Sequence, residues 1–267
     1  MIARRLQQGQ APGPAPTGIA AALVVAVVWV SGCATVAPPA SLGALATAMQ
    51  SARSSVHTYS ADARITYFGK EGRAKGGATL VVARPASLRY EVHGPHEGVV
   101  QAFATNGTEL QLLDFQESRF IYGPSTPDTL DRLMQFAPLH LSAAEWVAMM
   151  FGEVSIPQAA EIGSAKSQWL ARWTSDDVTR EVLIDPTTAR VSHIRALRGA
   201  SVLSDVSVTD YDKTGIPIVL HIVVPSADVD LELRLRDLII DPELDPAVFT
   251  LDAPKALTPE RIEGLPR

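Results

Sequence analysis

The segment VDLELRLRDLII (residues 229–240) alternates apolar and charged side chains along its length. Successive side chains of a β-strand point to opposite faces of a sheet. The segment therefore predicts a strand with Leu231, Leu233 and Leu235 on an apolar face and with its charged residues on a solvated face. Residues 202–211 alternate in the same way. Together the two segments predict an antiparallel sheet that is buried on one face only.

Further strand-like segments extend this prediction over most of the chain. They are residues 61–68, 78–84, 87–93, 98–105, 109–114, 119–123, 168–174, 178–184, 190–198 and 216–224. Asn106-Gly107 is a typical hairpin turn, whereas the charged, Gly-rich segment 69–77 is interpreted as a loop. We expect a mainly β (α+β) fold, a single curled antiparallel sheet that forms an unclosed barrel of about 11 strands, because so many strands cannot stay flat.

Three segments predict helices. Residues 41–56 carry apolar side chains at helical spacing, and Ser41 can cap them. Thr126 precedes Pro127 at the start of a second helix, and Ser142 begins a third with a capping box. The apolar residues of these two middle helices are Leu130, Leu133, Met134, Phe136, Trp146, Met149 and Met150. We expect them to form a lid over the apolar face, either lining a cavity or filling the core.

The N-terminus predicts export and lipid attachment. Residues 1–32 have a signal-peptide pattern, since two arginines precede an apolar run over residues 19–30. That run is too short to cross a bilayer as a helix, which needs about 20 residues. It ends in the lipobox-like sequence VSGC, in which Cys33 would receive lipid. We expect residues 33–40 to be a lipidated tether and residues 41–267 the folded domain; the alternative is a secreted protein whose cysteine lies there by chance.

Composition limits the partners of the exported chain. Residues 1–32 contain two of the 23 basic residues and none of the 29 acidic ones, so their removal leaves a net charge of −8. This acidic balance argues against binding nucleic acid or anionic headgroups by charge. Cys33 is the only cysteine, which excludes an intramolecular disulfide. In bacterial lipoproteins of the enterobacterial type, an Asp after the lipidated cysteine favours retention in the inner membrane. Ala34 occupies that position here, so we expect the outer membrane, with the domain facing the periplasm.

Three stretches are similar to elements of one known family. They are ARPASLRYE (residues 83–91), the hairpin from residue 105 to residue 114, and the end of the chain from Leu231 to Phe249. They resemble the LolA/LolB-like lipoprotein-carrier fold, and in particular the LolB-like outer-membrane lipoproteins. The order of strands, helical insert and further strands also matches, over roughly residues 41–254.

The resemblance implies an unclosed barrel, lidded by helices, that holds acyl chains in its hollow. LolB-like proteins also present an exposed apolar side chain on a protruding loop, whereas the corresponding segment here, residues 69–75, is charged and has no large apolar tip. Arg64 and Arg89 are candidates for polar groups inside the cavity that meet a lipid carbonyl or headgroup. The alternative for both is the solvated face of the sheet.

We therefore expect a membrane-tethered protein, not an enzyme, that binds lipid or lipoprotein acyl chains and functions in lipoprotein insertion into the outer membrane. A periplasmic carrier protein is a further expected partner. The alternative is an envelope scaffold or stress sensor that binds a protein. We expect no cofactor, no metal and no catalytic residue, because His93 and His96 lack further ligands at metal-site spacing and no nucleophile elbow or nucleotide-binding loop is present.

Overall fold

The computed structural model describes residues 37–70, 72–94, 98–134 and 136–264. The expected signal peptide and Cys33 lie outside the described residues. The described residues belong to one compact unit, residues 35–267. Among the helices that the structure describes, none is both long and apolar enough to span a membrane.

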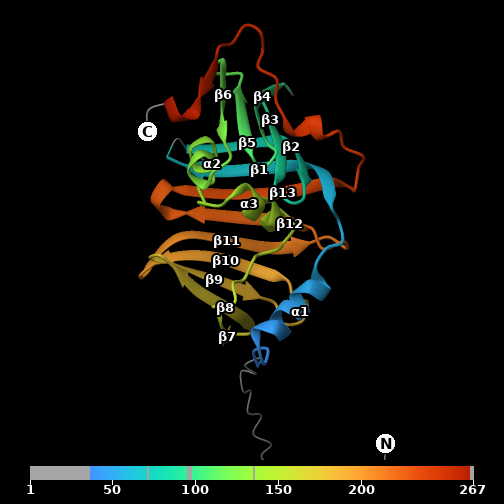
Figure 1. Cartoon of the computed structure of the whole chain (residues 1–267), viewed down its shortest axis with the longest axis vertical. Helices are drawn as coiled ribbons and strands as arrows, with labels where there is room; N and C mark the ends of the chain where they lie inside the picture. Colours follow the sequence, from blue (N-terminus) through green and yellow to red (C-terminus); the bar gives the residue numbers. More distant parts are fainter. Residues whose placement is uncertain (1–36, 71, 95–97, 135, 265–267) are drawn as a thin grey trace, which may run out of the picture. The chain divides into compact units, whose positions relative to one another are not determined.

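Fourteen strands of the described chain form one continuous sheet (Figure 1). Before the middle helices come β1 Thr58–Gly69, β2 Gly72–Ala83, β3 Ser87–His93, β4 Val99–Thr105, β5 Glu109–Asp114 and β6 Arg119–Pro124. After them come β7 Glu161–Ala165, β8 Gln168–Ser175, β9 Val178–Ile184, β10 Val191–Arg198, β11 Ser201–Tyr211, β12 Pro217–Val224, β13 Val229–Ile240 and β14 Pro259–Arg261. Their order in the sheet is β14-β6-β5-β4-β3-β2-β1-β13-β12-β11-β10-β9-β8-β7.

The predicted curled, unclosed antiparallel sheet is confirmed. Neighbouring strands such as β1 and β13 pair antiparallel, and β14 pairs parallel with β6. All the strand-like segments of the sequence are strands, and β7 and β14 are additional to them. Both additional strands are short and lie at the two ends of the strand order, where no long alternation of apolar residues marks them in the sequence.

The prediction of a loop over residues 69–77 is wrong. Gly69 pairs directly with Gly72, so β1 and β2 continue as a long hairpin. Gly72 has a φ of 104°, a left-handed conformation that glycine adopts without strain. The first residues of β2 are exposed. Because neither face of this extension packs on a core, its sequence lacks the alternation that marks the other strands.

The predicted helices are present, with the predicted caps. They are α1 Leu42–Ala52, α2 Pro127–Leu133 and α3 Ala143–Met150. The side chains of Ser41, Thr126 and Ser142 accept hydrogen bonds from backbone N–H groups of the first turns. The first helix ends before Val56, whose side chain is instead buried in the main core. Three short 3-10 helices follow in the second half of the chain, η1 Pro225–Ala227, η2 Pro246–Phe249 and η3 Ile262–Gly264.

The sheet is covered in three places. The main core lies between the central strands and the helices α2 and α3, which cross those strands in Figure 1. A second cluster joins Leu45 of α1 to β8, β9 and β10. A third packs Leu251 of the C-terminal segment against Ala102, Ala104, Leu113 and Phe120 of β4, β5 and β6. Those strands are therefore buried on both faces, so the expectation of one solvated face is wrong for them.

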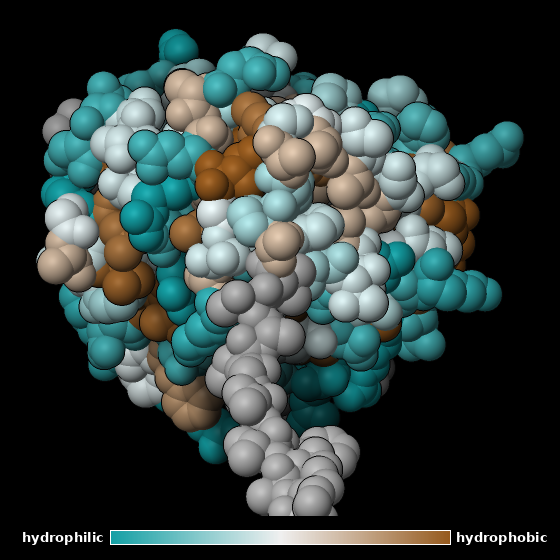
Figure 2. All heavy atoms as spheres, turned by 90° about the horizontal axis from the view of Figure 1, so that it is seen from below, coloured by the Kyte–Doolittle hydropathy of each residue, from teal (hydrophilic) through white to brown (hydrophobic). Residues whose placement is uncertain are grey.

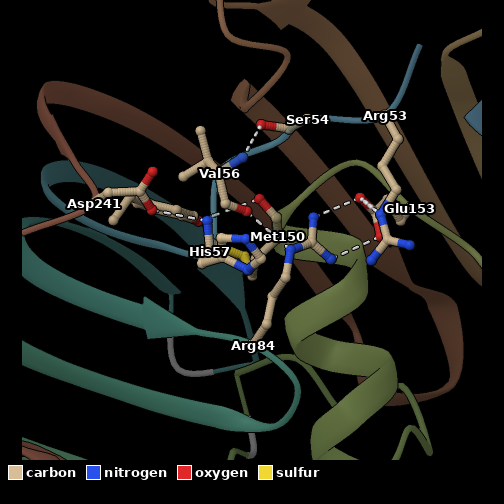
Figure 3. Close-up of polar contacts among 9 residues, drawn as sticks. Arg53, Ser54, Val56, His57, Arg84, Met150, Glu153 and Asp241 are labelled. Atoms are coloured by element: carbon tan, nitrogen blue, oxygen red, sulfur yellow. Dashed lines mark hydrogen bonds and ion pairs between the residues drawn. The ribbon is translucent and has the colours of Figure 1, made fainter. Parts of the chain in front are cut away.

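Asp241 fixes the point where β13 ends beside the start of β1. Its Oδ1 accepts hydrogen bonds from the backbone N–H groups of His57 at 2.8 Å and Thr58 at 3.0 Å, and Figure 3 shows the contact with His57. These two donors hold the pKa of the Asp241 carboxyl below its usual value. The ionised side chain therefore stabilises the junction of the two strands.

We expect Asp241→Asn to lower the melting temperature at neutral pH and to leave it nearly unchanged in acid. A carboxyl with a lowered folded pKa stabilises the fold above its unfolded pKa of about 3.9, and this contribution is lost as the pH falls through the folded value. Asn keeps one acceptor oxygen and tolerates the φ of 46° at this position. Thermal melts from about pH 7 to about pH 2 would show the difference between the two proteins shrinking. A difference that does not change with pH would contradict this account.

Candidate functional site

An apolar cavity of about 240 Å³ lies between the central strands and the middle helices. Its wall on the sheet side consists of Ile65, Tyr67, Ala78, Leu80, Leu88, Tyr90, Val92, Gln101, Leu220, Ile222, Leu231 and Leu233. Within each strand these are alternate residues, as the pleat of a sheet requires. Leu231 and Leu233 therefore face inward as predicted. The sheet face to which they belong both packs in the main core and lines the cavity.

The opposite wall comes from the segment that follows α2 and from α3. Met134, Phe136, Trp146 and Met150 line the cavity. The other predicted lid residues do not reach it: Leu133 lines a neighbouring pocket, and Leu130 and Met149 are buried in the main core. Met134, Trp146 and Met150 line the cavity and also belong to the main core.

A charged pocket of about 1000 Å³ adjoins the cavity. The two share Tyr67, Gln101 and Phe136 in their walls. The charged residues of the adjoining pocket are Lys70, Asp114, Glu117, Arg119, Asp128, Asp131 and Arg132. Burial raises the pKa of the Asp131 carboxyl, against the effect of the N–H of His140 that donates to it. The apolar cavity is therefore bordered by polar surface where these shared residues lie.

Tyr90 and Gln101 mark this border, and sequence reasoning missed both. The Tyr90 hydroxyl donates to Oε1 of Gln101 at 3.5 Å, and Nε2 of Gln101 donates to Asp114 at 3.4 Å. The Tyr90 ring stacks on Phe103 and meets Phe136 edge to face, with ring centroids 5.1 and 5.5 Å apart. Burial raises the pKa of the Tyr90 hydroxyl. Strand alternation alone would have placed Tyr90 inside, between Leu88 and Val92.

Neither Arg64 nor Arg89 lies among the residues that line the cavity. Arg64 is exposed, because Ala63 and Ile65 on either side of it face inward. Arg89 pairs with Glu91 and donates to the carbonyl of Val248 at 2.9 Å, on the face opposite the cavity. Both arginines therefore lie on the outer side of the sheet, away from the cavity.

A charged cluster at the end of β2 ties the lid to the sheet (Figure 3). Glu153, which follows α3, accepts two hydrogen bonds from the guanidinium of Arg84, at 2.8 and 2.5 Å. Arg53 donates to the same carboxylate at 2.8 Å. Arg84 also donates to the carbonyl of Val56 at 3.0 Å, and its guanidinium carbon lies 3.9 Å from the centre of the Phe151 ring. Three distant segments thus meet at one carboxylate.

A second pocket of about 240 Å³ lies beside α1 and has mixed polar and apolar walls. Figure 2 views the molecule from this end and shows apolar residues in separate patches among polar ones. The cavity under α2 and α3 is by contrast almost wholly apolar. We therefore regard that cavity as the candidate site.

The β1–β2 hairpin presents an exposed aromatic ring beside its turn. Phe68 is 43% exposed, and the guanidinium carbon of Arg73 lies 4.8 Å from the centre of its ring. Lys70 and Lys75 are exposed on the same hairpin. Residues 69–75 have no large apolar side chain, as the sequence showed, but Phe68 directly precedes them.

Of the two histidines considered as metal ligands, only His93 lies within the described residues. His93 Nε2 lies 3.0 Å from the hydroxyl of Thr79, while His96 lies outside the described residues. Among the residues that the structure describes, no group of three or more histidine, cysteine or acidic side chains is arranged to hold a metal ion.

Comparison with known proteins identifies the fold. No protein-family model matches the sequence, and no curated protein matches it either. The chain is similar to a LolA superfamily protein from Nitrosomonas europaea, with 10% identity, a TM-score of 0.54, and coverage of 79% of this chain and 98% of that one. It is similar to an outer membrane lipoprotein-sorting protein domain from Vibrio parahaemolyticus, with 11% identity, a TM-score of 0.55, and coverage of 77% of this chain and 94% of that one. It is also similar to a DUF1329 family protein from Desulfovibrio piger, with 10% identity, a TM-score of 0.54, and coverage of 77% of this chain and 94% of that one. At such low identity these similarities concern the fold alone.

Proposed function

We propose, from its LolA-like fold, that this protein is a membrane-tethered binder of lipid or lipoprotein acyl chains rather than an enzyme. One observation carries the proposal: the space between the central strands and the lid is lined by apolar side chains and left unfilled by them. The protein would accept an acyl chain there and release it at the outer membrane. The lipoprotein-sorting description of the Vibrio parahaemolyticus neighbour supports this role.

The energetics of the cavity favour such a ligand. Moving an acyl chain out of water recovers about 0.8 kcal/mol per CH₂ group. Ligand pockets usually measure about 300–1,000 Å³, so a cavity of about 240 Å³ holds part of one chain. Met134 and Met150 are flexible side chains that adapt to irregular ligands. Phe136 belongs to both the apolar and the charged pocket, so its movement would lengthen the cavity.

The test is to purify residues 35–267, without the signal peptide and cysteine, and to identify what accompanies them by mass spectrometry. We expect lipids or fatty acids to co-purify, and a fluorescent fatty acid to bind and to be displaced by unlabelled lipid. A protein that carries no lipid and fails to bind the fluorescent fatty acid would contradict the proposal.

The tether is the second part of the proposal. Lipid on Cys33 would hold the domain close to the outer membrane, since even a fully extended chain spans at most about 3.6 Å per residue and the expected tether is short. Metabolic labelling with palmitate should mark the full chain, and Cys33→Ser should abolish the label. Labelling that persists in Cys33→Ser would contradict attachment at this residue.

We expect Phe68→Ser to weaken binding of residues 35–267 to vesicles that contain anionic phospholipid, by about threefold or more. The exposed ring can enter the interface. Lys70, Arg73 and Lys75 form a local basic group that contributes about 1 kcal/mol per residue near an anionic surface, against the acidic balance of the chain as a whole. The measurement is co-sedimentation with vesicles. Phe115→Ser is the matched control, because Phe115 is 49% exposed on a different hairpin. Equal losses in both variants would contradict a specific docking role for Phe68.

The open edge of the sheet favours a second candidate function, that of a scaffold or stress sensor. The strand β7 is the last in the strand order and pairs only with β8 within the described residues. Such an edge can accept a strand from a partner protein. A partner captured equally well with and without lipid, and lost when Ser164→Pro removes a backbone N–H at the open edge of β7, would favour this role over the first.

A further inference from the structure

The indole N–H of Trp146 is the feature of the cavity that the proposed function does not yet use. Trp146 lies on α3, is 5% exposed and belongs to the cavity wall. Among the described residues, its Nε1 is the one buried side-chain nitrogen or oxygen without a hydrogen-bond partner. An indole N–H can only donate, and leaving a buried donor unpaired costs free energy. The wall of the apolar cavity therefore carries an unsatisfied donor.

The surroundings restrict what can satisfy this donor. The residues that line the cavity include no lysine, arginine, histidine or acidic side chain. Its other polar groups are Gln101 and the hydroxyls of Tyr67 and Tyr90. Tyr90 and Gln101 are bonded to each other, and Tyr67 and Gln101 also line the charged pocket. An ionised carboxylate would lose its hydration here without meeting a cation, which is strongly unfavourable. A neutral acceptor avoids that cost.

We propose that the cavity recognises the neutral carbonyl of an acyl ester, whose oxygen accepts a hydrogen bond from Nε1 of Trp146 while the chain fills the apolar space. This inference rests on the proposed function and adds a substrate class to it. A hydrocarbon would fill the same space and leave the donor unpaired. A free fatty acid would have to bind in its protonated form. The site is thus expected to prefer esterified acyl chains over both.

The experiment measures competition in residues 35–267 against the neutral probe N-phenyl-1-naphthylamine. The competitors are methyl laurate, laurate, and the n-alkane with as many non-hydrogen atoms as methyl laurate. In the wild-type chain we expect methyl laurate to bind more tightly than either of the others. In Trp146→Phe, which keeps an aromatic ring and loses the donor, we expect the affinity for methyl laurate to fall about fivefold while the affinity for the alkane stays unchanged.

Trp173→Phe is the matched control, because Trp173 packs in the second cluster, apart from the cavity. Its affinities for all three competitors should remain those of the wild-type chain. Equal losses of ester and alkane binding in Trp146→Phe would overturn the inference, since they would reflect packing alone. If neither the probe nor any competitor binds the wild-type chain, the proposed function itself fails.

A measurement on the wild-type chain keeps the inference testable if Trp146→Phe does not fold. The indole N–H groups of residues 35–267 come from Trp146, Trp169 and Trp173. In a nitrogen–proton correlation spectrum, methyl laurate should move one of these signals downfield, and the alkane should not, because a new hydrogen bond deshields the proton. The signal of Trp169, whose Nε1 donates to the carbonyl of Ala37 at 3.1 Å, should stay in place. No downfield shift with bound ester would overturn the inference.

Discussion

Ala78→Phe is expected to abolish acyl-chain binding and, at the same time, to raise the melting temperature. Ala78 lies on β2, is 3% exposed and lines the cavity of about 240 Å³. A phenyl ring there would occupy the space that the ligand needs, so we expect the affinity for a fluorescent fatty acid to fall at least about tenfold. Filling an empty cavity commonly stabilises a protein by about 0.5–2 kcal/mol. For a domain of this size, that corresponds to a rise of about 1–8 °C.

The opposite signs of the two effects make this variant informative. A substitution that damages the fold would lower both binding and stability. Ala74→Phe is the matched control, because Ala74 lies on the same strand, is exposed, and does not line the cavity. It should leave the affinity unchanged. Binding that survives in Ala78→Phe would place the ligand elsewhere, and a lower melting temperature would show that the side chains already fill this space.

The sequence predicted those parts of the fold that depend on local patterns. Leu231 and Leu233 face inward because a strand buried on one face must alternate, and Ser142 caps α3 because its hydroxyl and Glu145 satisfy each other's backbone groups. The hairpin extension beyond Phe68 was missed, because both of its faces are solvated and no alternation is needed. Local patterns therefore predict elements as far as those elements are packed.

The distinction between cavity and core could not be predicted in this way. Met149 and Met150 are adjacent, equally apolar and both part of the main core, but only Met150 also lines the cavity. An advance of one residue turns a side chain by about 100° around a helix, so the outcome depends on where the sheet lies. The ion pair of Arg84 and Glu153, 69 residues apart, likewise depends on tertiary contact. No spacing in the sequence indicates it.

Glu153→Gln is expected to destabilise the protein by about 2 kcal/mol, a fall in melting temperature of about 4–8 °C. The side chains of Arg84 and Glu153 are only 15% and 19% exposed, so removing the carboxylate leaves a mostly buried guanidinium without its counter-charge. Arg53→Gln is the control: Arg53 binds the same carboxylate but is 41% exposed, and such pairs contribute at most about 1 kcal/mol. Equal losses in the two variants would contradict the central role of Arg84.

The same substitution should also affect the lid. Glu153 follows α3 by three residues, and Trp146 and Met150 of that helix line the cavity. Because Arg84 anchors this segment to the end of β2, we expect Glu153→Gln to release a bound fluorescent fatty acid faster than the wild-type chain in stopped-flow displacement. Ala78→Phe removes the space, whereas Glu153→Gln leaves it intact and loosens one wall. Release at the wild-type rate, together with the expected loss of stability, would mean that the cluster holds the fold together without controlling access to the cavity.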